Sequence, residues 1–143
     1  MIQHEGRRVL RILHAEPDSR IREACAYDLA RMGHCYEGVQ SGELMLQEMT
    51  RASVPYDLLM VEIAMPSLDG IETVRLVREH ERNGSLKNRP VLFFSDIQPV
   101  GDLARAMQEL HPCFYQPKVI GGRDNLFPVL ERVLAHKDIT PYF

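Results

Sequence analysis

Short apolar runs alternate along the chain with longer stretches in which apolar residues recur every three or four positions. The short runs are bounded by Gly, Pro and polar turn residues, and they predict strands at 9–13, 34–39, 58–61, 91–95 and 113–116. The periodic stretches predict helices at 19–33, 42–52, 71–78, 103–110 and 126–134. The run 34–39 is the weakest of the five, and we expect it near an edge of the sheet.

Regular alternation of strands and helices is typical of an α/β fold, with a doubly wound parallel sheet covered by helices on both faces. We expect one domain over residues 8–136, with 1–7 and 137–143 as terminal tails. Open parallel sheets place their ligands and chemistry at the C-terminal ends of the strands. Those ends here supply His14, Ala15, Glu16, Glu62, Ser95 and Gln116.

Composition narrows the function classes. The chain has 143 residues, of which 45% are hydrophobic and 26% charged, as in an ordinary globular domain. A net charge of −3 gives no electrostatic argument for nucleic-acid binding, and no apolar stretch is long enough to span a membrane. Cys25, Cys35 and Cys113 form neither a zinc-type pair nor a disulfide framework. We therefore expect a cytoplasmic protein without a nucleic-acid or membrane partner.

The central apolar run, Leu58 to Val61, leads directly into one carboxylate, Glu62. A turn follows, in which Met65-Pro66 precedes Asp69-Gly70. The main role expected for Asp69 is to cap the next helix, with Gly70 permitting the turn. Glu62 is then the polar group to explain, because it stands where parallel sheets place their chemistry.

In its order of motifs the chain resembles the receiver domain of response regulators. The resemblance rests on Glu16-Pro17-x-x-Arg20 after the first strand, Met65-Pro66-x-x-Asp69-Gly70 after the third, and the run 90–95 that ends in Ser95. It implies a flavodoxin-like, three-layer sandwich with five parallel strands in the order 2-1-3-4-5. Receivers commonly transfer a phosphoryl group to an aspartate after the third strand, with help from Mg²⁺, a hydroxyl and a lysine.

The chain departs from that pattern at most of these positions. Glu62 stands at the phosphoacceptor position, and the acidic pair that would hold Mg²⁺ falls on His14 and Ala15, with Glu16 beside them. Only the hydroxyl, Ser95, is kept. The lysine position, immediately before the proline of the last strand, holds Gln116. The aromatic switch position falls on Cys113, and Pro117 is the cis-proline candidate.

These departures predict a pseudo-receiver without cofactor, in which Mg²⁺ binding is lost or weak and the usual phosphorylation is absent. One hypothesis makes Glu62 a mimic of the phosphorylated state, holding Ser95 inward while a protonated His14 balances its charge. The alternative is a remnant carboxylate that points to solvent. Two further possibilities are a transition-metal site on His14, Glu16 and Glu62, and a rescue of the missing lysine by Lys118, whose side chain we expect to point elsewhere.

The resulting expectation is a signalling module of a phosphorelay, not an enzyme. It would bind a protein partner, or a second copy, through the face formed by the fourth helix, fifth strand and fifth helix. Exposed candidates on that face are Gln108, Arg123, Glu131 and Arg132. The alternatives are a working phosphoacceptor receiver with Mg²⁺-dependent phosphorylation, and a flavodoxin-like module that binds a small ligand.

Overall fold

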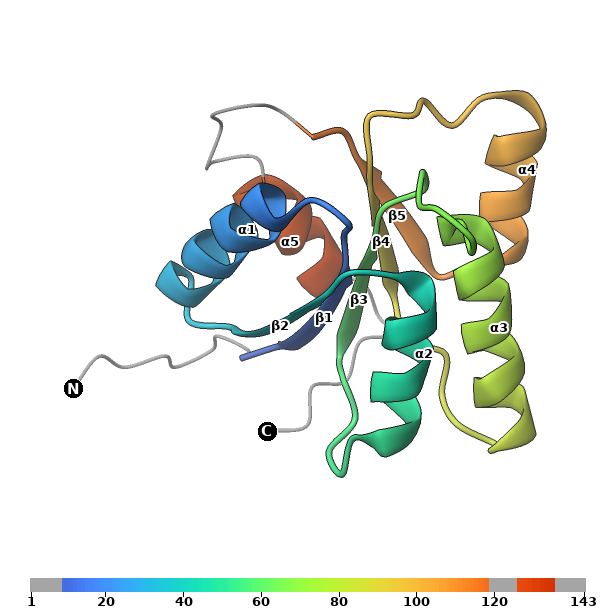
Figure 1. Cartoon of the computed structure of the whole chain (residues 1–143), viewed down its shortest axis with the longest axis horizontal. Coiled ribbons are helices and arrows are strands. Elements are labelled where there is room, and N and C mark those ends of the chain that lie inside the picture. The colour runs from blue at the N-terminus through green and yellow to red at the C-terminus, as the bar shows by residue number, and fades with distance from the viewer. Residues whose placement is uncertain (1–8, 119–125, 136–143) are drawn as a thin grey trace.

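The computed structural model describes residues 9–118 and 126–135, in which five strands alternate with five helices (Figure 1). The strands are β1 (Arg11–Ala15), β2 (Cys35–Val39), β3 (Leu58–Val61), β4 (Val91–Phe94) and β5 (Cys113–Gln116). The helices are α1 (Ser19–Arg31), α2 (Gly42–Arg51), α3 (Gly70–Asn83), α4 (Gly101–Glu109) and α5 (Leu126–Leu134). The predicted strands and helices are all present, and most of their ends differ from the prediction by at most two residues. The exception is α3, which continues to Asn83, five residues beyond its predicted end.

The strands form one parallel sheet in the order β2-β1-β3-β4-β5, as expected. The central strands β3 and β4 are buried along their whole length, because helices cover both of their faces. β2 lies at one edge and is partly exposed, as its weak apolar pattern predicted. β5 closes the other edge, so that the C-terminal ends of β1, β3, β4 and β5 share one rim of the sheet.

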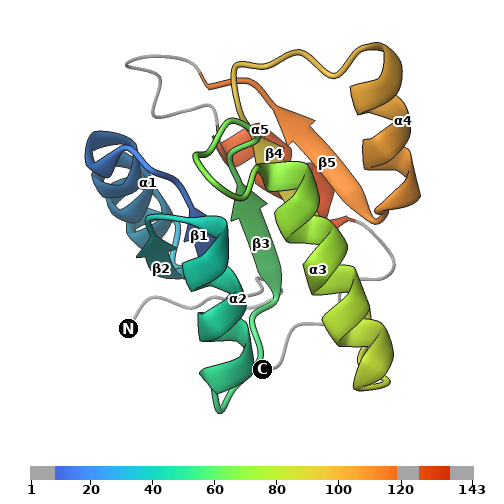
Figure 2. The same cartoon turned by 45° about the vertical axis from the view of Figure 1, so that its right-hand side comes forward.

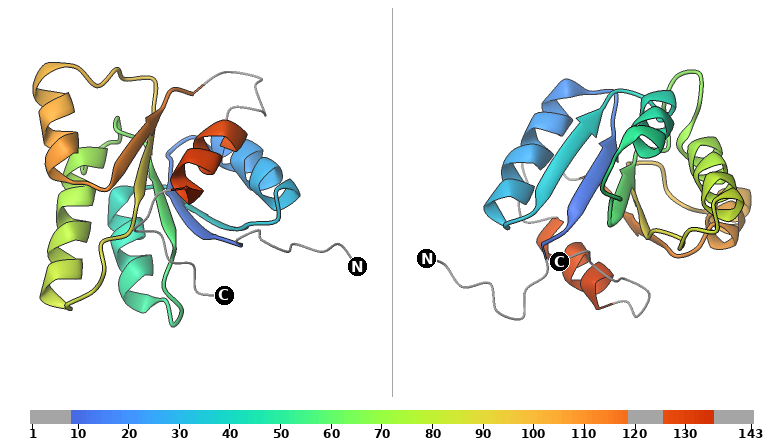
Figure 3. Two further views of the ribbon diagram at one scale, coloured as in Figure 1. Left: turned by 180° about the vertical axis from the view of Figure 1, so that it is seen from behind. Right: turned by 90° about the horizontal axis from the view of Figure 1, so that it is seen from below.

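Helices α1 and α5 cover one face of the sheet, whereas α2, α3 and α4 cover the other (Figures 1 and 2). Alternate strand residues point to opposite faces, and each face has its own apolar core. The α1–α5 side buries Leu10, Ile12, Leu58, Met60, Leu92 and Phe94 together with apolar residues of α5. The opposite side buries Leu13, Ala15, Leu59, Val61, Val91 and Phe93 beneath α2, α3 and α4. Figure 3 shows both layers from behind and from below.

Three helices begin at side-chain caps. Asp18 caps α1, Ser41 caps α2 and Asp69 caps α3, each accepting a hydrogen bond from a backbone N–H of the first turn. The prediction for Asp69 is therefore confirmed. Pro128 is the third residue of α5, in the first turn where proline is tolerated. The segment that directly precedes α5 and the predicted tails lie outside the described residues.

Gly70 is needed for close packing. A Cβ added at this position would lie 2.4 Å from the carbonyl oxygen of Glu62 and 2.8 Å from the Cα of Ile63. The Gly70 N–H also donates to the carbonyl of Ile63 at 2.9 Å. The first residue of α3 thus rests directly on the backbone that follows β3, and only a residue without a side chain fits there.

None of the described helices is both long and apolar enough to cross a bilayer.

Candidate functional site

Four polar side chains meet at the rim formed by the C-terminal ends of the strands. Glu16 directly follows β1, Glu62 directly follows β3, Ser95 directly follows β4, and Lys118 comes two residues after β5. The first three are buried, and the Lys118 side chain is 12% exposed. They converge because parallel strands end on the same edge of the sheet.

Both carboxylate oxygens of Glu62 have donors. Oε2 accepts hydrogen bonds from the Ser95 hydroxyl and, at 3.0 Å, from the N–H of Ala64. Oε1 accepts a hydrogen bond from the Lys118 ammonium. Glu62 is only 7% exposed, so it is not a remnant that points to solvent. The predicted contact with Ser95 is confirmed, and a buried carboxylate with three donors is the arrangement that such a charge requires.

Lys118 corrects the prediction for the lysine position. Its Nζ forms an ion pair with Glu16 Oε1 at 2.6 Å and a second with Glu62. Gln116, the residue expected there, pairs with Phe94 within the sheet, and its side-chain amide donates to the neighbouring carbonyl of Pro117 at 3.3 Å. The four-carbon stem of Lys118 lets its ammonium reach back over the rim, where two buried carboxylates attract it.

The residue at the aromatic switch position also lies two residues later than predicted: it is Tyr115, not Cys113. Cys113 lies at the first residue of β5, paired with Val91 and far from the rim, and its thiol contacts the carbonyl of Leu110. Tyr115 instead donates its hydroxyl to the backbone carbonyl of Ser95 at 2.9 Å. Cys113 and Gln116 are three residues apart, as are Tyr115 and Lys118. Moving both assignments two residues toward the C-terminus therefore corrects both predictions.

The cis-proline prediction is also wrong. The cis peptide bond found within the described residues joins His111 to Pro112, at the entry of β5, and the bond preceding Pro117 is not cis. Both bonds are of the X–Pro type, for which the cis form is accessible, so the sequence alone does not distinguish them.

His14 does not supply the counter-charge for Glu62. Its fully buried imidazole lies on the α1–α5 side of the sheet, where Nδ1 is 2.7 Å from the Tyr36 hydroxyl and the ring packs edge-on against Phe94. Desolvation, with smaller effects of the Lys118 and Arg22 charges, lowers the pKa of His14 to about 3. His14 is therefore neutral near pH 7, and Lys118 is the cation that faces Glu62.

The carboxylate of Glu16 is held from both ends. One oxygen pairs with Lys118, and the other accepts a hydrogen bond from the N–H of Asp18 at 3.0 Å. Arg22 donates to the carbonyl oxygens of Glu16, at 2.6 Å, and of Pro17. The loop between β1 and α1 is thus fixed by polar contacts from α1 and from the segment that follows β5.

The two partners in the central ion pair reinforce each other's charge. Burial acts against the ionised form of Glu62, but the hydrogen bonds from Lys118, Ser95 and Ala64 outweigh it, so the pKa of Glu62 lies below its ordinary value. Burial likewise acts against charged Lys118, and its bonds to Glu16 and Glu62 outweigh this and raise the pKa of Lys118. Both groups are accordingly ionised at neutral pH.

The donor set does not suit Mg²⁺. This ion needs octahedral oxygen ligands, usually carboxylates and waters, but the positions expected for the acidic pair hold the methyl group of Ala15 and an imidazole that faces Tyr36. The two remaining carboxylates already share the Lys118 ammonium. Across the described ranges, no three His, Cys, Asp or Glu residues gather as metal ligands, so His14, Glu16 and Glu62 do not form the considered transition-metal site.

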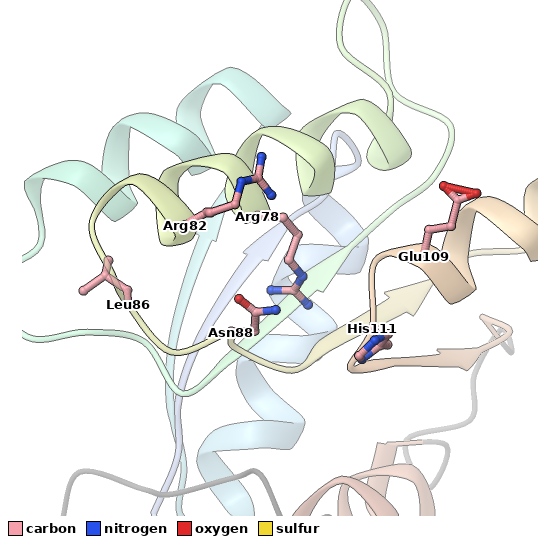
Figure 4. Close-up of a pocket in the computed structure, with 6 residues that line it drawn as sticks. All are labelled: Arg78, Arg82, Leu86, Asn88, Glu109 and His111. Atoms are coloured by element: carbon pink, nitrogen blue, oxygen red, sulfur yellow. The ribbon is translucent and has the colours of Figure 1, made fainter.

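A separate cavity of about 390 Å³ lies at the opposite end of the sheet, lined by Arg78, Arg82, Leu86, Asn88, Glu109 and His111 (Figure 4). Arg78 is buried and pairs with Glu81 at 2.7 Å, and its Nε donates to the carbonyl of Leu110 at 2.9 Å. Figure 4 shows Arg78 beside Asn88, whereas Glu109 extends away from them. The buried charge here links α3 to the start of β5 and lies away from the rim where the polar side chains meet.

The chain matches no profile of a known protein family. It is 31% identical over 75 residues, or 51% of its length, to a two-component response regulator of Oryza sativa subsp. japonica. It is 26% identical over 100 residues, or 70% of its length, to the sensory transduction protein BceR of Halalkalibacterium halodurans. The aligned regions span only 59% and 40% of these relatives.

Solved structures share the fold at lower identity. The chemotaxis protein CheY4 of Vibrio cholerae superposes with a TM-score of 0.75 at 19% identity, over 87% of this chain and 98% of that one. The receiver domain of the Arabidopsis thaliana histidine kinase CKI1, complexed with Mg²⁺, gives 0.74 at 21% identity, over 87% and 91%. The chain therefore has the fold of response-regulator receiver domains. The two relatives that it matches in sequence are a two-component response regulator and a sensory transduction protein.

Proposed function

We propose that this chain is an atypical receiver module, which signals through protein–protein contacts without the usual Mg²⁺-dependent phosphorylation. One observation carries the proposal: the Glu62 carboxylate is buried and engaged by a lysine, a hydroxyl and a backbone N–H. In receivers of the usual kind, the lysine and the hydroxyl bind the transferred phosphoryl group. Glu62 holds both partners through its own negative charge and in this way imitates the phosphorylated state.

The same contacts disfavour Glu62 as a nucleophile. An attacking carboxylate oxygen must give up its donors, and three charge-assisted or neutral hydrogen bonds hold this group in place. Glutamate also carries its carboxylate about one methylene beyond the position of aspartate, and a displacement of about 1 Å can cost roughly 10²-fold in rate. With the donor set for Mg²⁺ missing as well, the developing charge on a phosphoryl group lacks its usual stabilisation.

Contacts also link Glu62 to the face expected to bind a partner. The Ser95 hydroxyl donates to Glu62, while the Ser95 carbonyl accepts from Tyr115 on β5. Of the four candidates on the α4–β5–α5 face, Gln108, Glu131 and Arg132 are exposed, and Arg123 lies outside the described residues. The state of Glu62 can thus be transmitted to β5 through two hydrogen bonds, with a protein partner or a second copy as the recipient.

The decisive experiment offers the wild-type protein Mg²⁺ with beryllofluoride, a phosphoryl mimic, and follows its backbone amide signals by NMR. We expect no saturable shift around Glu62 and Ser95, and no stable label from a small phosphodonor. The response regulator TrrA of Thermotoga maritima, whose structure contains Mg²⁺ and beryllofluoride, is a suitable positive control. A saturable, Mg²⁺-dependent response would favour a working phosphoacceptor receiver instead.

A matched pair of variants tests the mimic itself. Glu62→Gln removes the negative charge but keeps the length of the side chain, whereas Glu79→Gln makes the same change on the exposed side of α3. We expect only Glu62→Gln to shift the amide signals of Ser95 and Tyr115 and to change binding of a partner or self-association. Identical behaviour of both variants would contradict a signalling role for Glu62.

A further inference from the structure

The cavity at the opposite end of the sheet from Glu62 has the size of a binding site for a small molecule. Its volume of about 390 Å³ lies within the range of such sites, roughly 300–1,000 Å³. Three parts of the chain contribute its walls: α3, the segment between α3 and β4, and the end of α4 with the turn before β5. A ligand in this cavity would contact all three.

Arg78 supplies a fixed positive charge in the wall of the cavity. It is buried, its Nε donates to the carbonyl of Leu110 at 2.9 Å, and its Nη1 donates to Glu81 at 2.7 Å. The remaining nitrogen, Nη2, lies 3.4 Å from the carbonyl oxygen of Pro112. Because every nitrogen of this guanidinium has an acceptor within the protein, its charge is already in position before a ligand binds.

The positive charge of the cavity exceeds what its surroundings balance. Both oxygens of the Glu81 carboxylate are engaged, one by Arg78 and the other by the N–H of Arg89 at 2.7 Å. Arg82 follows Arg78 by one helical turn, a spacing at which like charges repel, and it forms no ion pair within the described part of the chain. Glu109, the carboxylate that lines the cavity, extends away from the buried guanidinium (Figure 4). An anion would relieve this repulsion.

We infer that the cavity binds a small organic oxyanion, a phosphate or carboxylate group carried on an apolar body. Arg82 offers the planar set of N–H donors that matches either group. The Asn88 amide and the His111 ring can add neutral hydrogen bonds. A bare phosphate or carboxylate fills only part of the space, and the half-exposed Leu86 provides an apolar wall for the rest of the ligand. The inference does not depend on the function proposed for Glu62.

An occupied cavity would connect α3 to the entry of β5. Arg82 belongs to α3, and His111 lies in the turn that leads into β5. The carbonyl of the next residue, Pro112, accepts a hydrogen bond from the N–H of Val91 on β4 at 2.9 Å. A ligand held by both side chains would therefore stabilise the folded state, and the midpoint of thermal unfolding should rise with its concentration.

The experiment titrates phenyl phosphate and benzoate into the wild type and follows the backbone amide signals by NMR, with phenol as the neutral control. We expect saturable shifts at Asn88 and His111 with at least one of the anions and none with phenol. The anion that binds more tightly identifies the group as phosphate or carboxylate. No saturable shift with either anion, an equal response to phenol, or shifts centred on Ser95 at the rim would overturn the inference.

A matched pair of variants tests the contribution of the guanidinium. Arg82→Gln removes an exposed charge that lines the cavity, whereas Arg75→Gln removes an exposed charge of α3 outside it. We expect Arg82→Gln to weaken binding of the anion about tenfold, which is the effect of losing one charge-assisted hydrogen bond. Arg75→Gln should change the affinity by less than about twofold. Equal losses in the two variants would show attraction to the net charge of the protein and refute a specific site.

Discussion

The buried imidazole of His14 makes the stability of this domain depend on pH in a window that can be isolated. In the unfolded chain a histidine takes up a proton near pH 6.5, but in the folded protein desolvation lowers the pKa of His14 to about 3. Between these values the unfolded state binds more protons than the folded state, so stability must fall as the pH falls. Acidification therefore favours unfolding without any change in the native contacts.

The magnitude follows from the width of that window. Each pH unit below the unfolded pKa costs about 1.4 kcal/mol, so the folded protein should lose about 2 kcal/mol between pH 7 and pH 5 and about 4 kcal/mol in total by pH 3. The upper part of the window separates His14 from Glu62, whose lowered pKa places its own contribution to acid unfolding below pH 4.5. A loss of 2 kcal/mol is a large share of the stability of a small domain.

The assay is urea unfolding followed by circular dichroism at pH 7, 6 and 5, on the wild type and two variants. His14→Asn keeps a polar group within reach of the Tyr36 hydroxyl but cannot take up a proton, so its stability should change little over this range. His80→Asn, on the partly exposed side of α3, is the control for replacing a histidine elsewhere in the domain. If the wild type and His14→Asn show the same slope, His14 is not buried in its neutral form, and the reasoning fails.

Three further predictions concern buried contacts and are checked by the free energy of unfolding in urea. Lys118→Met should cost about 3–5 kcal/mol, because it leaves buried carboxylates without their cation, and adding Glu62→Gln should recover part of this loss. Gly70→Ala should cost at least about 1–3 kcal/mol, because its methyl group would overlap the carbonyl oxygen of Glu62. Arg78→Leu should cost about 3–5 kcal/mol, because it removes the ion-pair partner of the buried Glu81 carboxylate, which keeps the hydrogen bond from the N–H of Arg89.

Each of these changes has a control of the same type. Lys87→Met removes an exposed lysine and should cost less than about 1 kcal/mol. Gly84→Ala adds a methyl group at an exposed position whose nearest neighbour is the flexible side chain of Leu86 at 3.2 Å. If Lys118→Met costs no more than Lys87→Met, the ion pairs at the rim do not hold the site together.

Most of the fold could be predicted because its signals are local. The apolar runs, the helical spacing and the cap at Asp69 each depend on residues close in sequence, and the alternation of elements then leaves few topologies. Glu62 and Ser95 were likewise placed correctly, since both follow directly on buried strands. The edge position of β2 was visible in its mixed polar and apolar pattern.

The predictions of site residues fail where a long side chain reaches from one strand end to another. A lysine position directly before Pro117 predicts Gln116 and Cys113 at the site, but residue order along the chain does not fix position in space. The reach of Lys118 is set by its flexible stem and not by its backbone position, and no periodic pattern reports it. The side to which His14 points follows from strand alternation, since Leu13 and Ala15 pack on the α2–α3–α4 side, but its partner Tyr36 belongs to another strand.

Charge balance in the sequence alone points to Lys118 as the lysine of the site. The chain has three lysines, and of these only Lys118 comes shortly after a predicted strand end. Two carboxylates were expected at the same rim, with the acidic pair for Mg²⁺ missing, so a cation from the protein itself was needed to keep both ionised. Once a metal ligand set is lost, the remaining acidic residues must be protonated, exposed or paired. Asking which cation can reach them is a sharper test of a degenerate metal site than matching its motif position by position.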